Sequence, residues 1–136
     1  MIAAPVISFK NPFQTNILVP LFHRIVTKQK KSKHPSGHNT IKNYSGYDHY
    51  PLIALNEFRK MNNVVFKKLN RVKCPLLYVH SENDKMSLEK NIDFIMDNVS
   101  SKTKEKLIVK EASHHLFYEN PDQNKIFNTI LNFIST

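Results

Sequence analysis

The stretch Val-Lys-Cys-Pro-Leu-Leu-Tyr-Val-His-Ser-Glu-Asn-Asp, residues 72–84, decides the fold class of this chain. Pro75 marks the start of a strand, and residues 76–79 are continuously apolar, as expected of a strand that is covered on both faces. A second apolar run, residues 107–109, follows after a helical pattern. Strand, helix and strand in this order predict a right-handed parallel βαβ unit, so we expect an α/β fold.

Helical patterns follow each of these two runs. After Ser87, a suitable N-cap, the apolar residues lie on one helical face. They are Leu88, Ile92, Ile95, Met96 and Val99. Asn120-Pro121 opens a final helix, whose broad apolar face extends to Ile134. Residues 2–9 are apolar and predict a further short strand, which gives about three parallel strands with flanking helices.

The residues between the first strand and this unit predict a helical insertion. An apolar stripe at i, i+4 and i+8 over residues 17–26 predicts a short helix. A second helix begins at Pro51, because proline suits the first helical position, and we expect a break at Asn62-Asn63. Between these helices, residues 28–48 are polar and basic and contain both glycines, which predicts a long loop.

Asp84 and His115 each come shortly after one of the two apolar runs. Functional groups in parallel sheets collect just beyond the carboxyl ends of the strands, so we expect both side chains at one edge. An acid and a histidine in these places are two of the three catalytic groups of an α/β-hydrolase. The third group is missing, because no Gly-x-Ser-x-Gly occurs and the only glycines, Gly37 and Gly46, lie in the polar stretch.

Residues 72–84 resemble the strand and acid loop of the bacterial carboxylesterase and monoacylglycerol lipase group of α/β-hydrolases. Residues 111–115, Glu-Ala-Ser-His-His, resemble the loop that carries the catalytic histidine of that group. Residues 47–52 are similar to the end of its small cap, and residues 1–5 to the strand that precedes the cap. The resemblance covers nearly the whole chain but only the C-terminal half of a complete enzyme.

By position, the resemblance implies that Asp84 is the acid that orients the imidazole and that His115 is the general base. The chain departs from the group at Ser81 and at His114, where glycine is common. It also lacks the nucleophile elbow and the loop that supplies the oxyanion-hole amides. A poised imidazole then has no serine to activate, so we expect the chain alone to be inactive. We expect no cofactor and no metal.

The resemblance also implies the organisation of the chain, which is a partial α/β-hydrolase fold with a small helical cap. Residues 1–10 are expected to form the first strand, and residues 11–71 a cap-like helical insertion with a basic loop. Residues 72–136 are expected to form the C-terminal strand-helix-strand-helix unit that carries the acid and the histidine.

Other assignments of the chemistry find less support in the sequence. Cys74, the only thiol, precedes its strand while Asp84 follows it, so the two lie at opposite edges of the sheet; we expect Cys74 to be a small buried residue. Ser113 is too close to His115 on the same loop to serve as an independent nucleophile. A zinc site would need His80, Asp84 and the two adjacent histidines to converge, but adjacent side chains on a strand end tend to point apart.

Length and composition indicate a single domain with a modest hydrophobic core. The chain has 136 residues, a net charge of +9 and 40% apolar residues. The charge suggests affinity for anionic surfaces, but the basic run at residues 24–33 lacks interleaved aromatic residues, so we expect no specific nucleic-acid binding. A single cysteine suits the cytoplasm, and no apolar stretch reaches the ~18 residues that a membrane span needs.

The sequence thus predicts part of a serine carboxylesterase that supplies acid and base without the nucleophile. If an N-terminal half completes the site, the implied substrate is a small acyl ester. The alternative is a non-catalytic binding or assembly module that keeps the apolar groove of the cap. We also expect a homo-oligomer, because the strand at residues 2–9 would present an open, uncharged edge.

Overall fold

The computed structural model describes residues 1–9, 11–30, 49–117 and 120–135. The chain divides into two compact units, one of residues 1–8 and 68–136 and the other of residues 9–67. Residues 31–48, which make up most of the predicted basic loop, lie outside the described residues.

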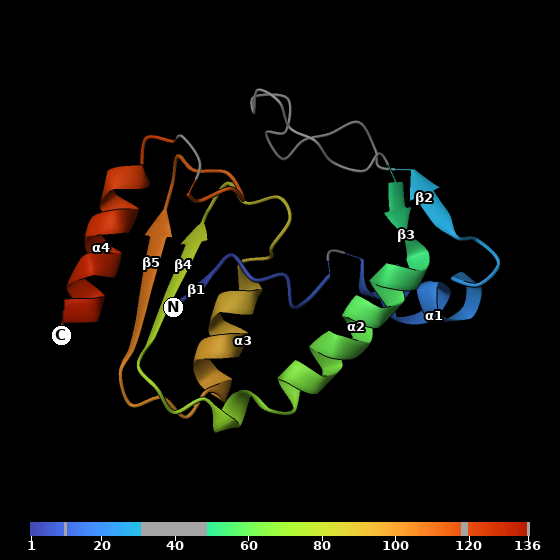
Figure 1. Ribbon diagram of the computed structural model, residues 1–136, viewed down its shortest axis with the longest axis horizontal. Coiled ribbons are helices and arrows are strands. Elements are labelled where there is room, and N and C mark those ends of the chain that lie inside the picture. The colour runs from blue at the N-terminus through green and yellow to red at the C-terminus, as the bar shows by residue number, and fades with distance from the viewer. Residues whose placement is uncertain (10, 31–48, 118–119, 136) are drawn as a thin grey trace. The chain divides into compact units, whose positions relative to one another are not determined.

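The first unit contains a parallel sheet of three strands in the order β1-β4-β5, shown in Figure 1. These strands are β1 (Ile2–Ala3), β4 (Leu76–Ser81) and β5 (Lys104–Val109). Tyr78 and Val79 pair with β1, and all six residues of β4 pair with β5. Every residue of β4 is buried, as the continuous apolar run indicates. The predicted parallel strand-helix-strand unit is therefore confirmed.

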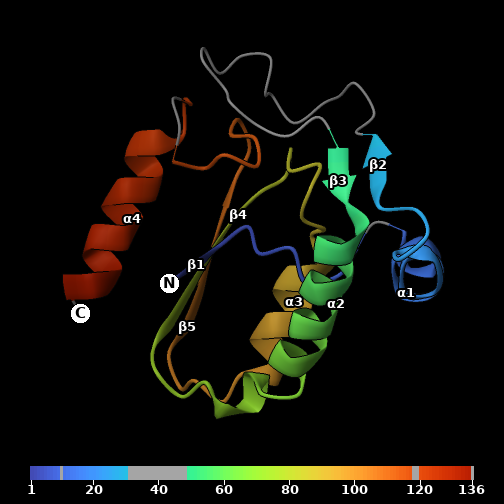
Figure 2. The same cartoon turned by 45° about the vertical axis from the view of Figure 1, so that its right-hand side comes forward.

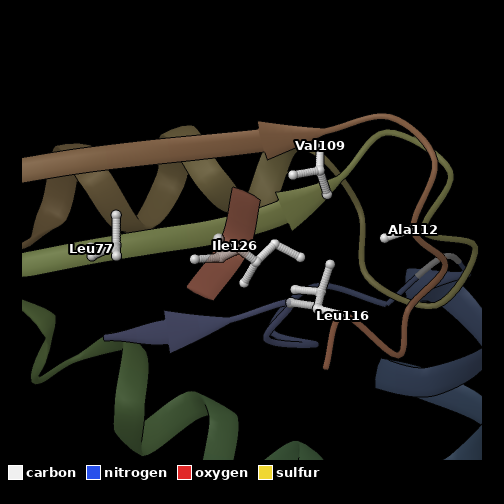
Figure 3. Packing of buried hydrophobic residues seen from close by; sticks show 7 residues of the cluster. Leu77, Val109, Ala112, Leu116 and Ile126 are labelled. Atoms are coloured by element: carbon white, nitrogen blue, oxygen red, sulfur yellow. The ribbon is translucent and has the colours of Figure 1, made fainter. Parts of the chain in front are cut away.

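Helices α3 (Lys90–Asn98) and α4 (Gln123–Ser135) cover opposite faces of this sheet, as Figure 2 shows. On the α4 side, Leu77 and Val79 of β4 pack in one cluster with Ile126 (Figure 3). The remaining buried members of this cluster are Ala4, Val109, Ala112 and Leu116. Full burial of an aliphatic side chain such as Ile126 stabilises a fold by roughly 1.5–3 kcal/mol, and Ile130 and Phe133 of α4 also pack against this cluster.

Strand β1 is much shorter than the predicted strand of residues 2–9. Its last paired residue is Ala3, and Ala4 then takes up a left-handed conformation with φ of 41°. The N–H of Ala4 still donates to the carbonyl of Val79 over 2.9 Å. Pro5 has no N–H to continue the ladder, so the prediction of a longer strand was wrong.

Helix α3 begins later than predicted. Its first residue is Lys90, and the side chain of Ser87 does not cap it. The Ser87 hydroxyl donates instead to the carbonyl of Pro5 over 2.7 Å. The predicted apolar face is present, because Ile92, Ile95 and Val99 are all buried.

The described part of the second unit contains helical segments and two paired antiparallel strands. The first predicted helix is a π-helical turn, η1 (Gln14–Leu18), that continues into α1 (Val19–Phe22). Strand β2 (Lys28–Lys30) pairs antiparallel with β3 (His49–Pro51), so the first residues of the predicted loop are in fact a strand. Helix α2 (Leu52–Phe66) runs through Asn62-Asn63 without a break, and a short 3-10 turn, η3 (Leu69–Arg71), precedes β4 in the first unit.

Candidate active site

The acid loop holds Asp84 just beyond the C-terminal end of β4. Its side chain is fully buried, with 0% exposed. One carboxylate oxygen, Oδ1, accepts the N–H groups of Met86 at 2.7 Å and Ser87 at 2.9 Å. The N–H of Asp84 in turn donates to the carbonyl of Ser81. The loop therefore closes around its own carboxylate, which fixes the direction of the second oxygen.

The second carboxylate oxygen of Asp84 binds His114. Nδ1 of His114 lies 2.8 Å from Oδ2, and the His114 side chain is 25% exposed. Burial raises the pKa of Asp84, but hydrogen bonds from His114 and from the N–H groups of Ser87 and Met86 outweigh it, so the pKa lies below its ordinary value. An ionised carboxylate only accepts hydrogen bonds, so the Nδ1 of His114 carries the proton. In the neutral ring, Nε2 is then the free base.

The histidine loop is fixed by a second aspartate, Asp122. Its Oδ2 accepts three successive backbone N–H groups, from Lys110 at 3.1 Å, Glu111 at 2.7 Å and Ala112 at 3.3 Å. Such a row of N–H groups binds an anion well, so Asp122 stabilises the turn that leads from β5 to the histidines. The N–H of Asp122 itself donates to the side chain of Asn120, just before α4.

Two side chains connect the acid loop to the histidine loop. The hydroxyl of Ser81 donates to the carbonyl of Ala112, and the side-chain amide of Asn83 donates to the carbonyl of Lys110. Ser81 stands where the resembled group commonly has glycine, and here its hydroxyl joins the two loops. Asp84 and His114 are thus brought together by their own hydrogen bond and by these two hydrogen bonds from side chains of the acid loop to backbone carbonyls of the histidine loop.

The structure brings Asp84 together with His114, whereas the sequence pointed to His115 as its partner. Ala112 and Leu116 are both buried in the hydrophobic cluster. The loop between them is therefore anchored at both ends, and of the two imidazoles within it the one from residue 114 reaches the carboxylate. His115 lies directly beside it, with ring centroids 5.7 Å apart at an angle of 70°. The base role predicted for His115 stays a prediction, and the contact with the acid belongs to His114.

A pocket of about 470 Å³ opens beside the two histidines. Residues 3–4 at the end of β1 and residues 114–117 line it. A volume of this size suits a small organic ligand. The apolar walls of the pocket are next to the imidazole of His114, which Asp84 orients. These walls are formed by Ala3, Ala4, Leu116 and Phe117.

The other groups that the sequence offered as a nucleophile or as metal ligands do not join Asp84 and His114 in a site. Cys74 is exposed, so the prediction that it is buried was wrong; it lies in the loop before β4 and not in the strand itself. Ser113 accepts the N–H of His115 through its hydroxyl oxygen. Within the described ranges, no three histidine, cysteine, aspartate or glutamate side chains gather as a metal site would require.

Sequence reasoning did not predict the hydrogen bonds by which four polar side chains support the site: those of Ser81, Ser87, Asn91 and Asp122. The acidic residue directly after Asn120-Pro121 was the one local signal, because a carboxylate is favoured near a helix N-terminus. Ser81, Ser87 and Asn91 each have a backbone partner that is distant in sequence, and no local pattern shows those contacts. Across the described parts of the chain, none of the helices has the length and apolar character that crossing a membrane requires.

Comparison with solved structures gives the wider context of this site. One of the metagenome-derived lipolytic enzymes LipS and LipT is similar with a TM-score of 0.77 and 20% identity, over 98% of this chain and 53% of that enzyme. The Paleococcus ferrophilus monoacylglycerol lipase matches with a TM-score of 0.75 and 15% identity, over 98% and 57%. A soluble variant of the Saccharomyces cerevisiae monoglyceride lipase matches with a TM-score of 0.73 and 15% identity, over 96% and 50%.

No protein-family model matches the sequence, and no curated protein matches it. At 15–20% identity, the likeness to these structures concerns the fold. The parallel sheet, its flanking helices and the order of the acid and histidine loops all lie within the matched part, because the match covers nearly the whole chain. The chain therefore has a partial α/β-hydrolase fold and spans about half the length of the lipases and esterases that it resembles.

Proposed function

We propose that this chain supplies the acid and the base of a serine hydrolase that acts on acyl esters. The observation that carries the proposal is the hydrogen bond of 2.8 Å between the buried carboxylate of Asp84 and Nδ1 of His114. A carboxylate on Nδ1 holds the imidazole in the tautomer that leaves Nε2 free. This is the arrangement that a serine hydroxyl needs from its base.

In the completed site, Nε2 of His114 takes the proton of a serine hydroxyl as that oxygen attacks the ester carbonyl. Asp84 stabilises the resulting imidazolium without taking up the proton itself. The imidazolium then returns the proton to the leaving alcohol. The serine and the oxyanion-hole amides come from an N-terminal half, because neither a nucleophile elbow nor such a loop is recognisable in this chain.

The size and lining of the pocket beside the histidines favour a substrate ester with a small or medium acyl group. Its walls at Ala3, Ala4 and Leu116 offer no charged partner to a substrate, and its volume is about 470 Å³. The similar solved structures are lipolytic enzymes and monoacylglycerol lipases, which are hydrolases of ester bonds.

A direct test compares the chain alone with the chain completed by the matching N-terminal half of a similar lipase. The chain alone is expected to leave p-nitrophenyl butyrate intact and to resist labelling by a fluorophosphonate. The completed protein is expected to hydrolyse the ester, and Asp84→Asn should lower kcat by about 10⁴-fold, as expected when the imidazole is held in the wrong tautomer. Turnover that is insensitive to Asp84→Asn would overturn the proposal.

The same assay separates the two histidines. His114→Ala is expected to abolish turnover, and His115→Ala to reduce it less. The opposite order would assign the base to His115, as the position of that residue in the sequence predicts. Labelling of a serine in the chain alone would contradict the absence of a nucleophile.

A further inference from the structure

A cluster of buried polar side chains lies between the end of β1 and the acid loop and takes no part in the proposed proton transfer. Its members are Ser87, which is 1% exposed, and Asn91, which is 0% exposed. Asn91 belongs to the buried face of α3, whose neighbouring buried residues Ile92 and Ile95 are apolar. Burial of a side-chain amide costs free energy unless the amide is fully hydrogen-bonded. The groups that the amide of Asn91 binds therefore decide what its burial costs.

The amide of Asn91 holds the chain segment that leaves β1. Its Nδ2 donates to the carbonyl of Pro5 and to the Ser87 hydroxyl oxygen, at 3.3 Å each, and its Oδ1 accepts the N–H of Ser8 at 3.0 Å. The Ser87 hydroxyl donates to the same carbonyl of Pro5 over 2.7 Å. The side chains of Ser87 and Asn91 thus hold residues 5–8 near the start of α3 by hydrogen bonds between residues more than 80 positions apart in the sequence.

Ser87 also belongs to the acid loop. Its N–H donates to Oδ1 of Asp84 over 2.9 Å, while its hydroxyl binds Pro5. One residue therefore connects the buried carboxylate to the end of β1. Any shift of residues 5–8 away from α3 would act on the hydrogen bond that orients Asp84.

The segment that is held in this way directly follows one wall of the pocket, which Ala3 and Ala4 form. Ala4 directly precedes Pro5, lines the pocket together with His114, and has a φ of 41°, which a residue with a Cβ rarely adopts. Such a conformation persists where the surroundings determine it. Here the surroundings are the hydrogen bond from Ala4 to Val79 on one side and the contacts of Pro5 on the other.

We propose that Ser87 and Asn91 are positioning residues, which hold the Ala4 wall of the pocket and the Asp84 carboxylate in one fixed geometry. The pair sets the distance between the apolar wall and the oriented imidazole, and so limits the acyl group that fits between them. This role in substrate choice rests on the proposed esterase function. The geometry itself is testable in the isolated chain without any turnover, so the two proposals fail separately.

The test compares Ser87→Ala with Ser101→Ala by NMR. Ser101 is a matched control, because it is also buried, at 5% exposed, and its hydroxyl also donates to backbone carbonyls, those of Val72 and Cys74. Those carbonyls precede β4 and so lie at the other end of the strand from Asp84. Two signals are measured: hydrogen exchange at the N–H of Ala4, and the resonance of the Nδ1 proton of His114.

Ser87→Ala is expected to speed exchange at Ala4 about tenfold and to shift the His114 proton, since it removes one buried hydrogen bond. Ser101→Ala should leave both signals as in the parent chain. Equal effects of the two variants, or no effect of Ser87→Ala, would overturn the proposal.

A measurement on the unaltered chain covers the case in which Ser87→Ala does not fold. The side-chain amide protons of Asn91 are expected to exchange at least a hundredfold more slowly than those of the exposed Asn98, whose amide donates to Phe94 within the same helix. Equal exchange rates for the two amides would show that the cluster is open and would exclude the positioning role.

Discussion

At the scale of single residues, the site depends on buried polar groups that satisfy one another. The side chain of Asp84 is completely buried, and one imidazole and two backbone N–H groups that donate to it favour its ionised form. His80, the residue before the last residue of β4, is a buried polar group without such partners. It is 1% exposed, and its Nδ1 has no hydrogen-bond partner among the described residues. Burial therefore disfavours the charged form of its imidazole.

His80 should make the stability of the protein depend on pH. Burial lowers the pKa of His80 below 6.5; the negative charges of Asp84 and Glu89 oppose this effect, and repulsion from His114 adds to it. The unfolded chain then binds more protons than the folded chain just below pH 6.5, so the stabilising contribution is complete above that pH and is lost as the pH falls. We expect the free energy of unfolding to decrease between pH 7 and pH 5 in urea titrations.

The variant His80→Phe should flatten this dependence, because it removes the buried titrating group. His49→Gln, at an exposed position, serves as the control and should leave the dependence unchanged. A decrease between pH 7 and pH 5 that is as steep in His80→Phe as in the parent chain would assign the effect to other groups.

At the scale of elements, Ile126 is the one fully buried side chain of the described part of α4, and Ile130 and Phe133 pack around it against the sheet. Ile126 is fully buried against Leu77 and Val79. Ile126→Ala should therefore lower the free energy of unfolding by about 2–5 kcal/mol, as for other large-to-small changes in protein cores. Phe94→Ala on α3, where the side chain is 40% exposed, should change it by less than about 1 kcal/mol. Similar losses in chemical denaturation for both variants would contradict this description of the core.

The elements that the sequence predicted well are those with a strong local pattern. Strand β4 was recognisable because its residues are continuously apolar, and α3 because Ile92 and Ile95 recur at helical spacing. Pro5 was a local signal for the early end of β1, whereas the left-handed conformation of Ala4 was not visible, since it depends on distant contacts. The same holds for the histidine that meets Asp84, because two adjacent residues of one loop differ in direction and not in sequence context.

At the scale of the whole molecule, we still expect the chain to self-associate, although the reason differs from the one that the sequence suggested. With only two paired residues, β1 offers little open edge to another strand. Helix α4 instead exposes Phe127, Leu131 and Ile134 on one stripe, with 43%, 62% and 74% of these side chains accessible. A two-fold axis would let this stripe cover itself.

Light scattering should accordingly give the mass of a dimer at micromolar concentrations. Leu131→Lys should shift the protein toward the monomer, because it places a charge in the middle of the apolar stripe. Asn128→Lys, on the same helix and also exposed, should leave the mass unchanged. A parent chain that stays monomeric throughout the concentration range would refute the dimer.

The most direct test of the acid-base pair is the imidazole NMR spectrum of the isolated chain. The hydrogen bond between Asp84 and His114 predicts one downfield Nδ1 proton that is protected from exchange with water. This signal should be present in the parent chain and in His115→Ala, and absent in His114→Ala and in Asp84→Asn. A signal that disappears in His115→Ala and survives in His114→Ala would contradict the assignment and give the role to His115.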